Sequence, residues 1–349
     1  MIGEAGARRV LVDAIRAGVF PAAAVDVGDS RGSIWTDAFG TLSFGPGSMS
    51  TTSDTPFDLA SLTKPIATTS LVMRLVDAGA IELDDPVARF FTEWLGEDRE
   101  AATIRDLLEH ASGLPARLVD APPETRREFE HEICAIRLEY ARRTQSIYSD
   151  LGFLLLGFLV ADVGGASLDA QFDAFWHDPR LAYHAPAPAS ARTAPTTPLP
   201  EDSRKGRTLT GEVHDNYAAA LGGVAGHAGL FGTAPAVGAF ARVVLRAARG
   251  GTDAPPPFSP MRVAELTRRS GVPGSSRALG WDTMLPTSSC GTRMSASAFG
   301  HVGFTGTSLW IDPARDRYFV LLTNRARGGG TLEEMRDVRR AFHDALGEL

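Results

Sequence analysis

The sequence is poor in cysteine and has no long uninterrupted apolar run. Its 349 residues include two cysteines, Cys134 and Cys290, which lie far apart and belong to no Cys-x-x-Cys motif. This excludes a disulfide framework and a zinc finger, and we expect both thiols to be free and buried. Near the N-terminus, Asp13, Arg16 and Pro21 interrupt each apolar run before it reaches the length of a signal peptide or a membrane span. We therefore expect no membrane span and a cytoplasmic location, or a periplasmic or secreted one if a leader precedes this sequence.

Positive charge is also scarce, and lysine most of all. The 35 basic residues are outnumbered by 42 acidic ones, which gives a formal charge of -7. This leaves no overall positive field for a nucleic acid, so we expect a small-molecule partner instead. The chain has two lysines, Lys64 and Lys205, so a motif that needs lysine rarely arises here by chance. The composition, 44% hydrophobic and 22% charged, is typical of one large soluble domain or two interlocked ones.

The spacing of apolar residues changes along the chain. It predicts a helix over residues 7–18, followed by an antiparallel hairpin from two β-compatible stretches, 19–27 and 33–45. Apolar residues three and four apart then predict an all-helical segment over residues 61–165. Residues 185–205, rich in Pro, Ala, Ser and Thr, indicate a surface loop.

The C-terminal part returns to strands and ends in a helix. Three strand candidates precede one helix candidate: residues 278–284, 299–313 and 316–325, then 331–346. The pattern predicts an α/β (α+β) fold, in which N- and C-terminal helices flank an antiparallel sheet and an all-helical domain is inserted. We expect a discontinuous α/β domain and a mainly helical domain with the active-site cleft between them: residues 1–58 with 276–349, and residues 59–275.

The motif Ser61-Leu62-Thr63-Lys64 stands where an extended segment gives way to a helix. The spacing of three places the Ser61 hydroxyl and the Lys64 amine on one helix face. A serine becomes a competent nucleophile when a nearby base removes its proton and helix-terminal N–H groups stabilise the developing negative charge. The alternative is an N-capping serine followed by a solvated lysine.

Two further motifs support this chemistry when they are taken together with the first. Tyr148 and Asp150 precede a predicted helix, where the phenol could reach the Ser61–Lys64 pair, although Tyr148 alone is also typical of a core aromatic and Asp150 of an N-cap. His301 and Gly303 lie on a predicted strand that could supply an oxyanion donor. The alternative there is a glycine-bearing bulge with an exposed histidine.

These motifs resemble those of the serine penicillin-recognising hydrolases, nearest the class C β-lactamase-like branch that also contains esterases and D,D-peptidases. The motifs occur in that family's order, and supporting phrases such as LLEHASGLP and GFTGTSLWIDP are similar too. The resemblance implies a β-lactamase/transpeptidase-like fold and no metal or organic cofactor. It also implies that Ser61 is acylated, that Lys64 and Tyr148 transfer protons, and that the N–H groups of Ser61 and Phe304 form the oxyanion hole.

The sequence departs from the family pattern at two positions that concern the substrate. Asp150 stands where Asn is usual, and a carboxylate accepts hydrogen bonds but cannot donate one to a substrate amide carbonyl. His301 replaces a lysine, which removes a permanent positive charge that could attract a substrate carboxylate. Arg325 could supply the missing charge, although an exposed strand-end arginine is the usual interpretation.

Three other polar residues could in principle bind a metal, but their spacing matches no compact metal motif: His214, Asp215 and His227. We therefore expect no metal, and we interpret His110 as a structural hydrogen-bonding residue. The function expected first is a serine hydrolase with carboxylesterase-type activity on small acyl substrates. The alternatives are a D-alanyl-D-alanine carboxypeptidase, a weak β-lactamase, or a penicillin-binding sensor that acylates without turnover. The sequence carries no indication of oligomeric state.

Overall fold

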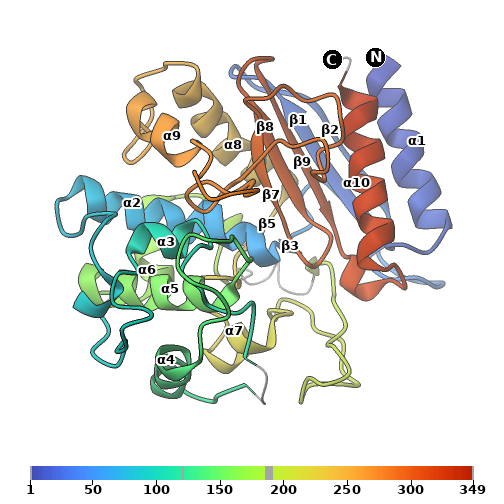
Figure 1. Cartoon of the computed structure of the whole chain (residues 1–349). Coiled ribbons are helices and arrows are strands. Elements are labelled where there is room, and N and C mark those ends of the chain that lie inside the picture. The colour runs from blue at the N-terminus through green and yellow to red at the C-terminus, as the bar shows by residue number, and fades with distance from the viewer. Residues whose placement is uncertain (1, 119–121, 185–191, 348–349) are drawn as a thin grey trace.

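A six-stranded antiparallel sheet forms the centre of the α/β part of the molecule (Figure 1). The computed structural model describes residues 2–118, 122–184 and 192–347. In spatial order the strands of the sheet are β2 (Ser33–Gly40), β1 (Ala22–Gly28), β9 (Arg317–Thr323), β8 (Ser308–Asp312), β7 (Phe299–Val302) and β6 (Asp282–Thr283). Strand β1 is buried along its whole length because it pairs on both edges and is covered on both faces. The predicted N-terminal hairpin and the antiparallel sheet are confirmed.

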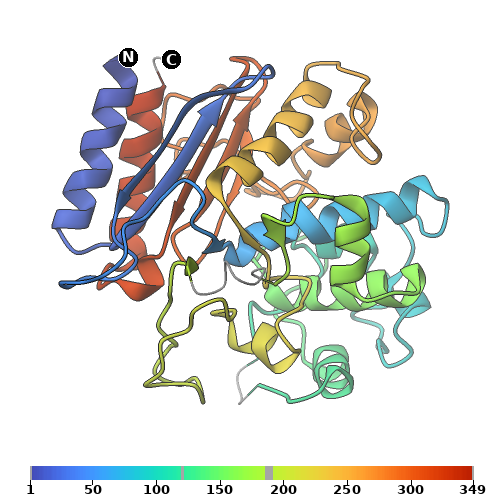
Figure 2. The same ribbon diagram turned by 180° about the vertical axis from the view of Figure 1, so that it is seen from behind.

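The two terminal helices cover one face of this sheet. Helices α1 (Ile2–Arg16) and α10 (Leu332–Leu346) lie side by side there, which brings the two ends of the chain together (Figures 1 and 2). Apolar residues at helical spacing, among them Leu11 and Phe342, pack into a core shared with the sheet. Helix α10 begins at a capping box, in which the Thr331 side chain and the Glu334 side chain each accept a backbone N–H of the other residue.

The opposite face of the sheet is covered by helix α8 (Ala234–Ala248), which packs against β1 and β9 (Figure 2). The close approach depends on Gly238, where an added Cβ would lie 1.9 Å from a carboxylate oxygen of Asp26 on β1. Helix α8 lies inside residues 59–275, the range predicted as the mainly helical domain. Its packing therefore joins that range to the sheet, and the division into two domains stays a prediction.

The remaining helices form a second region around a buried central helix. They are α2 (Ser70–Asp77), α3 (Ile104–Leu108), α4 (Arg126–Ala135), α5 (Asp150–Gly164), α6 (Leu168–Phe175) and α7 (Asn216–Ala220), with the short 3₁₀ helix Val87–Arg89. Helix α9 (Pro260–Leu266) packs beside α8 instead. Residues 151–160 of α5 are buried on all sides, and the helix ends at Gly165 in the left-handed conformation. Among the described residues, no single helix has the length and apolar composition to cross a membrane, although the bent pair of α5 and α6 has both.

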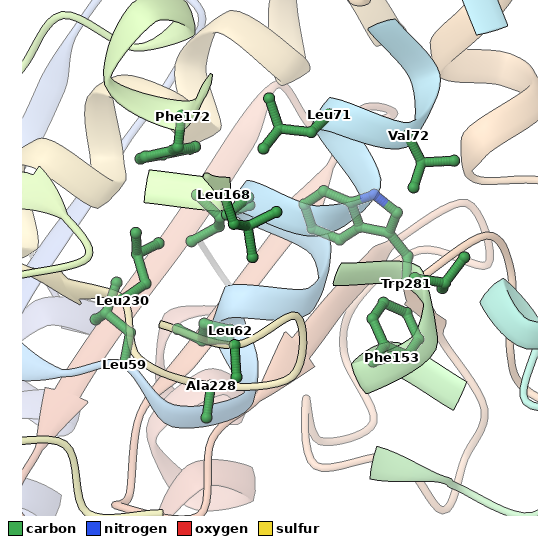
Figure 3. Packing of buried hydrophobic residues seen from close by; sticks show 14 of the residues in the cluster. Leu59, Leu62, Leu71, Val72, Phe153, Leu168, Phe172, Ala228, Leu230 and Trp281 are labelled. Atoms are coloured by element: carbon green, nitrogen blue, oxygen red, sulfur yellow. The ribbon is translucent and has the colours of Figure 1, made fainter. Parts of the chain in front are cut away.

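One large apolar core connects this helical region to the sheet. Figure 3 shows Leu59 and Leu62 beside Leu230, and Phe153 beside Trp281, all within that core. These side chains come from the nucleophile segment, a glycine-rich loop, helix α5 and the segment before β6. The segment that carries the candidate nucleophile is therefore fixed from several directions.

Several predicted boundaries are wrong. Residues 299–313 form two strands, β7 and β8, because the chain turns at Gly306, whose φ is 113°. Residues 278–284 contribute a strand of only two residues, β6. A small sheet of β3 (Phe57–Asp58), β5 (Phe231–Gly232) and β4 (Leu181–Ala182) was not anticipated. Residues 185–191 of the predicted surface loop lie outside the described residues.

Candidate active site

The segment that carries Ser61 is a strained turn. Strand β3 leads into a 3₁₀ helix, Ala60–Leu62, and then into a π-helix, Lys64–Thr69, where the sequence had predicted ordinary α-helix. Ala60 has a φ of 48°, which is uncommon for a residue with a side chain and is often found at functional sites. Its N–H donates to the buried Asp58 carboxylate at 2.8 Å, and the other oxygen of Asp58 accepts the N–H of His214 at 2.6 Å. Burial raises the pKa of Asp58 to about 6, although these two backbone hydrogen bonds oppose the rise.

The three predicted catalytic side chains lie together at this turn. Lys64 Nζ donates to Ser61 Oγ at 3.0 Å, and the Tyr148 hydroxyl donates to the same oxygen at 2.6 Å. Lys64 Nζ also lies 4.7 Å from the centre of the Tyr148 ring. The serine oxygen is therefore held between the two groups that could exchange a proton with it.

Lys64 is fully buried but remains a cation. Burial is the largest single influence and by itself lowers the pKa of its amine, yet the Asp150 carboxylate at 2.8 Å and Tyr148 together raise the pKa above its ordinary value. Burial raises the pKa of Tyr148 as well, and the charge of Lys64 only partly offsets this. The resting site therefore contains a charged lysine and a neutral phenol.

Asp150 connects Lys64 to a further set of charges. It is the first residue of α5, whose N-cap is Ser149 and not Asp150, so its carboxylate is available for other contacts. One oxygen accepts Lys64 Nζ, and the other accepts a hydrogen bond from Arg117 at 2.9 Å. The same Arg117 nitrogen donates to Asp215 at 2.8 Å.

The residues considered as metal ligands are only partly brought together. Asp150, Asp215 and His227 place ligand atoms within 4.8 Å of one another, whereas His214 lies apart, with its ring stacked on Phe304. However, Arg117 already donates to both carboxylates, so a metal ion would have to displace a guanidinium that satisfies them. These residues fit an internal ion-pair network better than a metal site.

The wall formed by the sheet carries little charge. His301 is buried, and burial together with the charges of Arg277 and Lys64 holds the pKa of its imidazole well below the ordinary range. Its Nδ1 contacts the carbonyl of Val302 at 2.9 Å, and Nε2 has no hydrogen-bond partner within the described part of the chain. The alternative interpretation of His301 as an exposed histidine is therefore wrong. A neutral imidazole does not replace the missing lysine charge.

Gly303 and Phe304 follow His301 at the turn between β7 and β8. A Cβ at Gly303 would lie 2.6 Å from the carbonyl oxygen of Leu59, so the glycine lets this turn pack against the segment that carries the nucleophile. Phe304 lines the same cavity as Ser61 and exposes 37% of its surface there. These positions are compatible with the predicted oxyanion hole, which stays a prediction.

Arg325 is not the exposed strand-end arginine of the usual interpretation. It is buried, and its guanidinium donates to the carbonyl of Phe304 at 2.6 and 3.1 Å and to that of Gly330 at 3.1 Å. Its charge lies 4.6 Å from the centre of the Phe304 ring. Arg325 therefore holds Phe304 in place and does not face the substrate cavity as a free cation.

A cavity of about 750 Å³ opens beside Ser61, a size typical of small-molecule sites. Its walls combine charged groups with apolar ones such as Leu118, Leu199 and Phe304. The sequence did not reveal two arginines near the site. Arg117 lines the cavity just after the LLEHASGLP phrase, and Arg277 lies 5.1 Å from the centre of the Tyr148 ring. Only the folded arrangement identifies them, because neither belongs to a motif.

His110 has the structural role that we expected. Its Nδ1 accepts the N–H of Ser149 at 3.0 Å, and its ring lies 4.7 Å from that of Tyr148. Burial lowers the pKa of this imidazole well below its ordinary value, so it is neutral. His110 therefore supports the segment that carries Tyr148 and Asp150.

A protein-family model and two named relatives match most of this chain. The beta-lactamase family model matches residues 8–343. The chain is 32% identical over 311 residues to a protein of Salmonella gallinarum named as a D-alanyl-D-alanine carboxypeptidase, covering 78% of this chain and 70% of the relative. It is 31% identical over 303 residues to the N-acetylmuramyl-L-alanine amidase of Bacillus subtilis, covering 78% and 68%.

Solved structures share the fold at lower identity. A class C beta-lactamase from Rhodobacter sphaeroides has a TM-score of 0.78 at 20% identity, with 98% of this chain and 99% of that one covered. EstCE1, a hydrolase with promiscuous acyltransferase activity, has a TM-score of 0.77 at 18% identity, with 99% and 98% covered. The likeness to these two supports the fold alone.

Proposed function

Because the chain belongs to the beta-lactamase family of serine hydrolases, we propose that it hydrolyses an amide bond in a cell-wall peptide through an acyl-enzyme on Ser61. The observation that carries the chemistry is the position of Ser61 Oγ, 3.0 Å from Lys64 Nζ and 2.6 Å from the Tyr148 hydroxyl, beside a large cavity. The names of the two relatives above 30% identity support the substrate class, since both name amide hydrolases.

The protonation states of Lys64, a cation, and Tyr148, a neutral phenol, favour proton transfer through Tyr148. During acylation a bond forms between Ser61 Oγ and the substrate carbonyl carbon, and the carbon–nitrogen bond breaks. Tyr148 accepts the serine proton as it passes its own proton to the leaving nitrogen, so the phenol stays neutral overall. Lys64, held as a cation by Asp150, stabilises the negative charge that passes across the serine and tyrosine oxygens. Water then hydrolyses the acyl-enzyme by the reverse relay.

Within the amide hydrolases we propose the carboxypeptidase class, which cleaves next to a free terminal carboxylate. Arg277 supports this choice because it is partly buried, and its guanidinium has no ion pair or hydrogen bond with the described residues. Its charge lowers the pKa of both His110 and His301, which places it close to them. A substrate carboxylate would give this cation the partner that it lacks.

Hydrolysis of small esters is the second candidate. It is favoured by Asp150, since its carboxylate oxygens accept hydrogen bonds from Lys64 and Arg117 and cannot donate to a substrate amide. An ester also has a better leaving group, so it depends less on proton delivery.

The test compares an N-acylated peptide ending in D-alanyl-D-alanine with p-nitrophenyl butyrate and nitrocefin, using the wild type, Ser61→Ala and Ser70→Ala. Ser70 is a matched control because it is a buried serine on the same segment, and its hydroxyl donates to a backbone carbonyl. We expect release of D-alanine that Ser61→Ala abolishes and Ser70→Ala retains. Turnover of the ester alone would favour the esterase, and one stoichiometric acylation without turnover would favour the sensor.

A further inference from the structure

Lys64 is part of a closed ring of polar contacts that extends into the cavity wall. Its Nζ donates to Asp150 at 2.8 Å, and Asp150 accepts Arg117 at 2.9 Å. Arg117 donates to Asp215 at 2.8 Å, and Asp215 contacts Nε2 of His227 at 2.7 Å. The carbonyl of His227 accepts Lys64 Nζ at 3.2 Å, which closes the ring.

The ring brings two carboxylates together under one guanidinium nitrogen. Asp150 and Asp215 accept hydrogen bonds from the same nitrogen of Arg117, and the side chains of the two acids are only 13% and 18% exposed. Two carboxylates this close cannot both stay ionised without a cation between them. Of the neighbouring groups, Lys64 contacts Asp150 and His227 contacts Asp215, whereas Arg117 donates to both carboxylates.

We propose that Arg117 is a positioning residue of the reaction, which keeps Asp150 ionised and directed at Lys64 by bridging it to Asp215. This inference rests on the proposed acylation of Ser61 with Lys64 beside it. It adds a residue that no motif of the sequence indicates. Arg117 is well placed for this role because it is also held from a third side by Asn216 at 2.6 Å and by the Tyr217 ring, whose centre lies 3.9 Å from the guanidinium carbon.

Other charged and titratable groups lie around Lys64 and could also affect the pH dependence of the activity. They are Tyr148, which precedes α5; the neutral imidazoles of His110 and His301, whose pKa values Lys64 lowers; His227; and Arg277 across the Tyr148 ring. None of them hydrogen-bonds to Asp150 in place of Arg117, although His227, which lies within 4.8 Å of Asp150, also lowers the pKa of that carboxyl. Removing the positive charge of Arg117 therefore raises the pKa of Asp150, and it also raises that of Lys64 directly, because a neighbouring positive charge is lost.

The test is the pH dependence of kcat/KM for p-nitrophenyl acetate, which reports groups of the free enzyme. In Arg117→Gln we expect the whole profile to move to higher pH, with the acid limb shifted by about one unit or more. Arg117→Lys should restore most of the wild-type profile. Asp215→Asn should move the profile to lower pH, since it removes a negative charge while an asparagine can still cap α7.

The matched control is Arg126→Gln. The side chain of Arg126 is 40% exposed and that of Arg117 is 37% exposed. Arg126 also pairs with a carboxylate and lies over an aromatic ring, but it belongs to the outer helix α4. Its profile should keep the wild-type midpoints. A lower plateau with unchanged midpoints in both Arg117→Gln and Asp215→Asn would overturn the proposal. Turnover that does not depend on Ser61 would instead contradict the proposed function, which separates the two failures.

Discussion

The two walls of the cavity differ in where they carry charge. The helical wall carries Lys64, Asp150, Arg117 and Asp215, whose opposite charges pair within hydrogen-bond distance. On the sheet side Phe304 lines the cavity, and His301, which is not among the lining residues, is a neutral buried imidazole. We therefore propose that proton transfer and charge stabilisation depend on the helical wall, while the sheet wall gives the cavity its shape and the predicted oxyanion donors.

Two arginines, one at each wall, differ in the same way. Arg117 binds carboxylates, and their charges raise its pKa even though burial opposes this. Among the described residues Arg325 hydrogen-bonds to carbonyl oxygens alone, and burial lowers its pKa. An arginine can thus tune protonation on one side of a cavity and fix the backbone on the other. Substitutions on the two walls should consequently have different effects on kcat, KM and substrate selectivity.

The largest effect should come from removing the cation of the helical wall. We expect Lys64→Met to lower kcat by about 10³-fold or more, because both the proton relay and charge stabilisation lose their partner. Lys205→Met is the matched control, since Lys205 is the other lysine of the chain and is exposed. Steady-state rates with one ester and one peptide measure both variants. A Lys64→Met enzyme within tenfold of wild type would place the proton chemistry elsewhere.

A smaller effect, on selectivity, should come from Asp150→Asn. The amide can donate to a substrate carbonyl, so the ratio of peptide to ester turnover should rise by about tenfold, the value of one hydrogen bond. The ratio of kcat/KM for the two substrates is the measurement. If the ratio is unchanged, Asp150 does not select between amides and esters.

On the sheet wall, Arg325→Met should lower kcat by about tenfold and leave KM almost unchanged. The variant frees the Phe304 carbonyl and so lets the predicted oxyanion donor move, which weakens transition-state binding more than substrate binding. Arg327→Met is the control, because Arg327 lies on the same short helix, Arg325–Arg327, but contacts Ser43 and Thr197. A pure rise in KM for Arg325→Met would instead indicate direct contact with substrate.

Asp58 lies at the junction of the two walls. Its substitution should change activity least, but it should change the pH dependence of the free energy of unfolding. Its pKa of about 6 in the folded protein lies above the ordinary 3.8, so the protonated form is favoured by folding. Protonated Asp58 contributes on the order of 2 to 3 kcal/mol to the free energy of unfolding. This contribution is complete below about pH 4 and is lost as the pH rises through 6. Urea unfolding of wild type and Asp58→Asn at pH 4 to 7 tests this. Parallel stability profiles for the two proteins would refute the raised pKa.

The features that could be predicted from the sequence are those that depend on the spacing of nearby residues. Ser61 and Lys64 are three residues apart on one segment, so their contact follows from helix geometry. The antiparallel sheet and the two terminal helices follow from apolar patterning. Arg117 and Arg277 could not be found in this way, because only tertiary packing brings them to Tyr148 and Asp150. The burial of Arg325 was missed for the same reason, since its partners are backbone carbonyls on other turns.

Every step proposed above depends on acylation of Ser61 between the two walls. The most direct measurement is the intact mass of the protein after brief incubation with a slowly released acyl donor, followed by mapping of the modified peptide. We expect a single added acyl group on Ser61, lost on prolonged incubation and absent in Ser61→Ala. A stable adduct on another residue, in a protein that still turns over substrate, would contradict it.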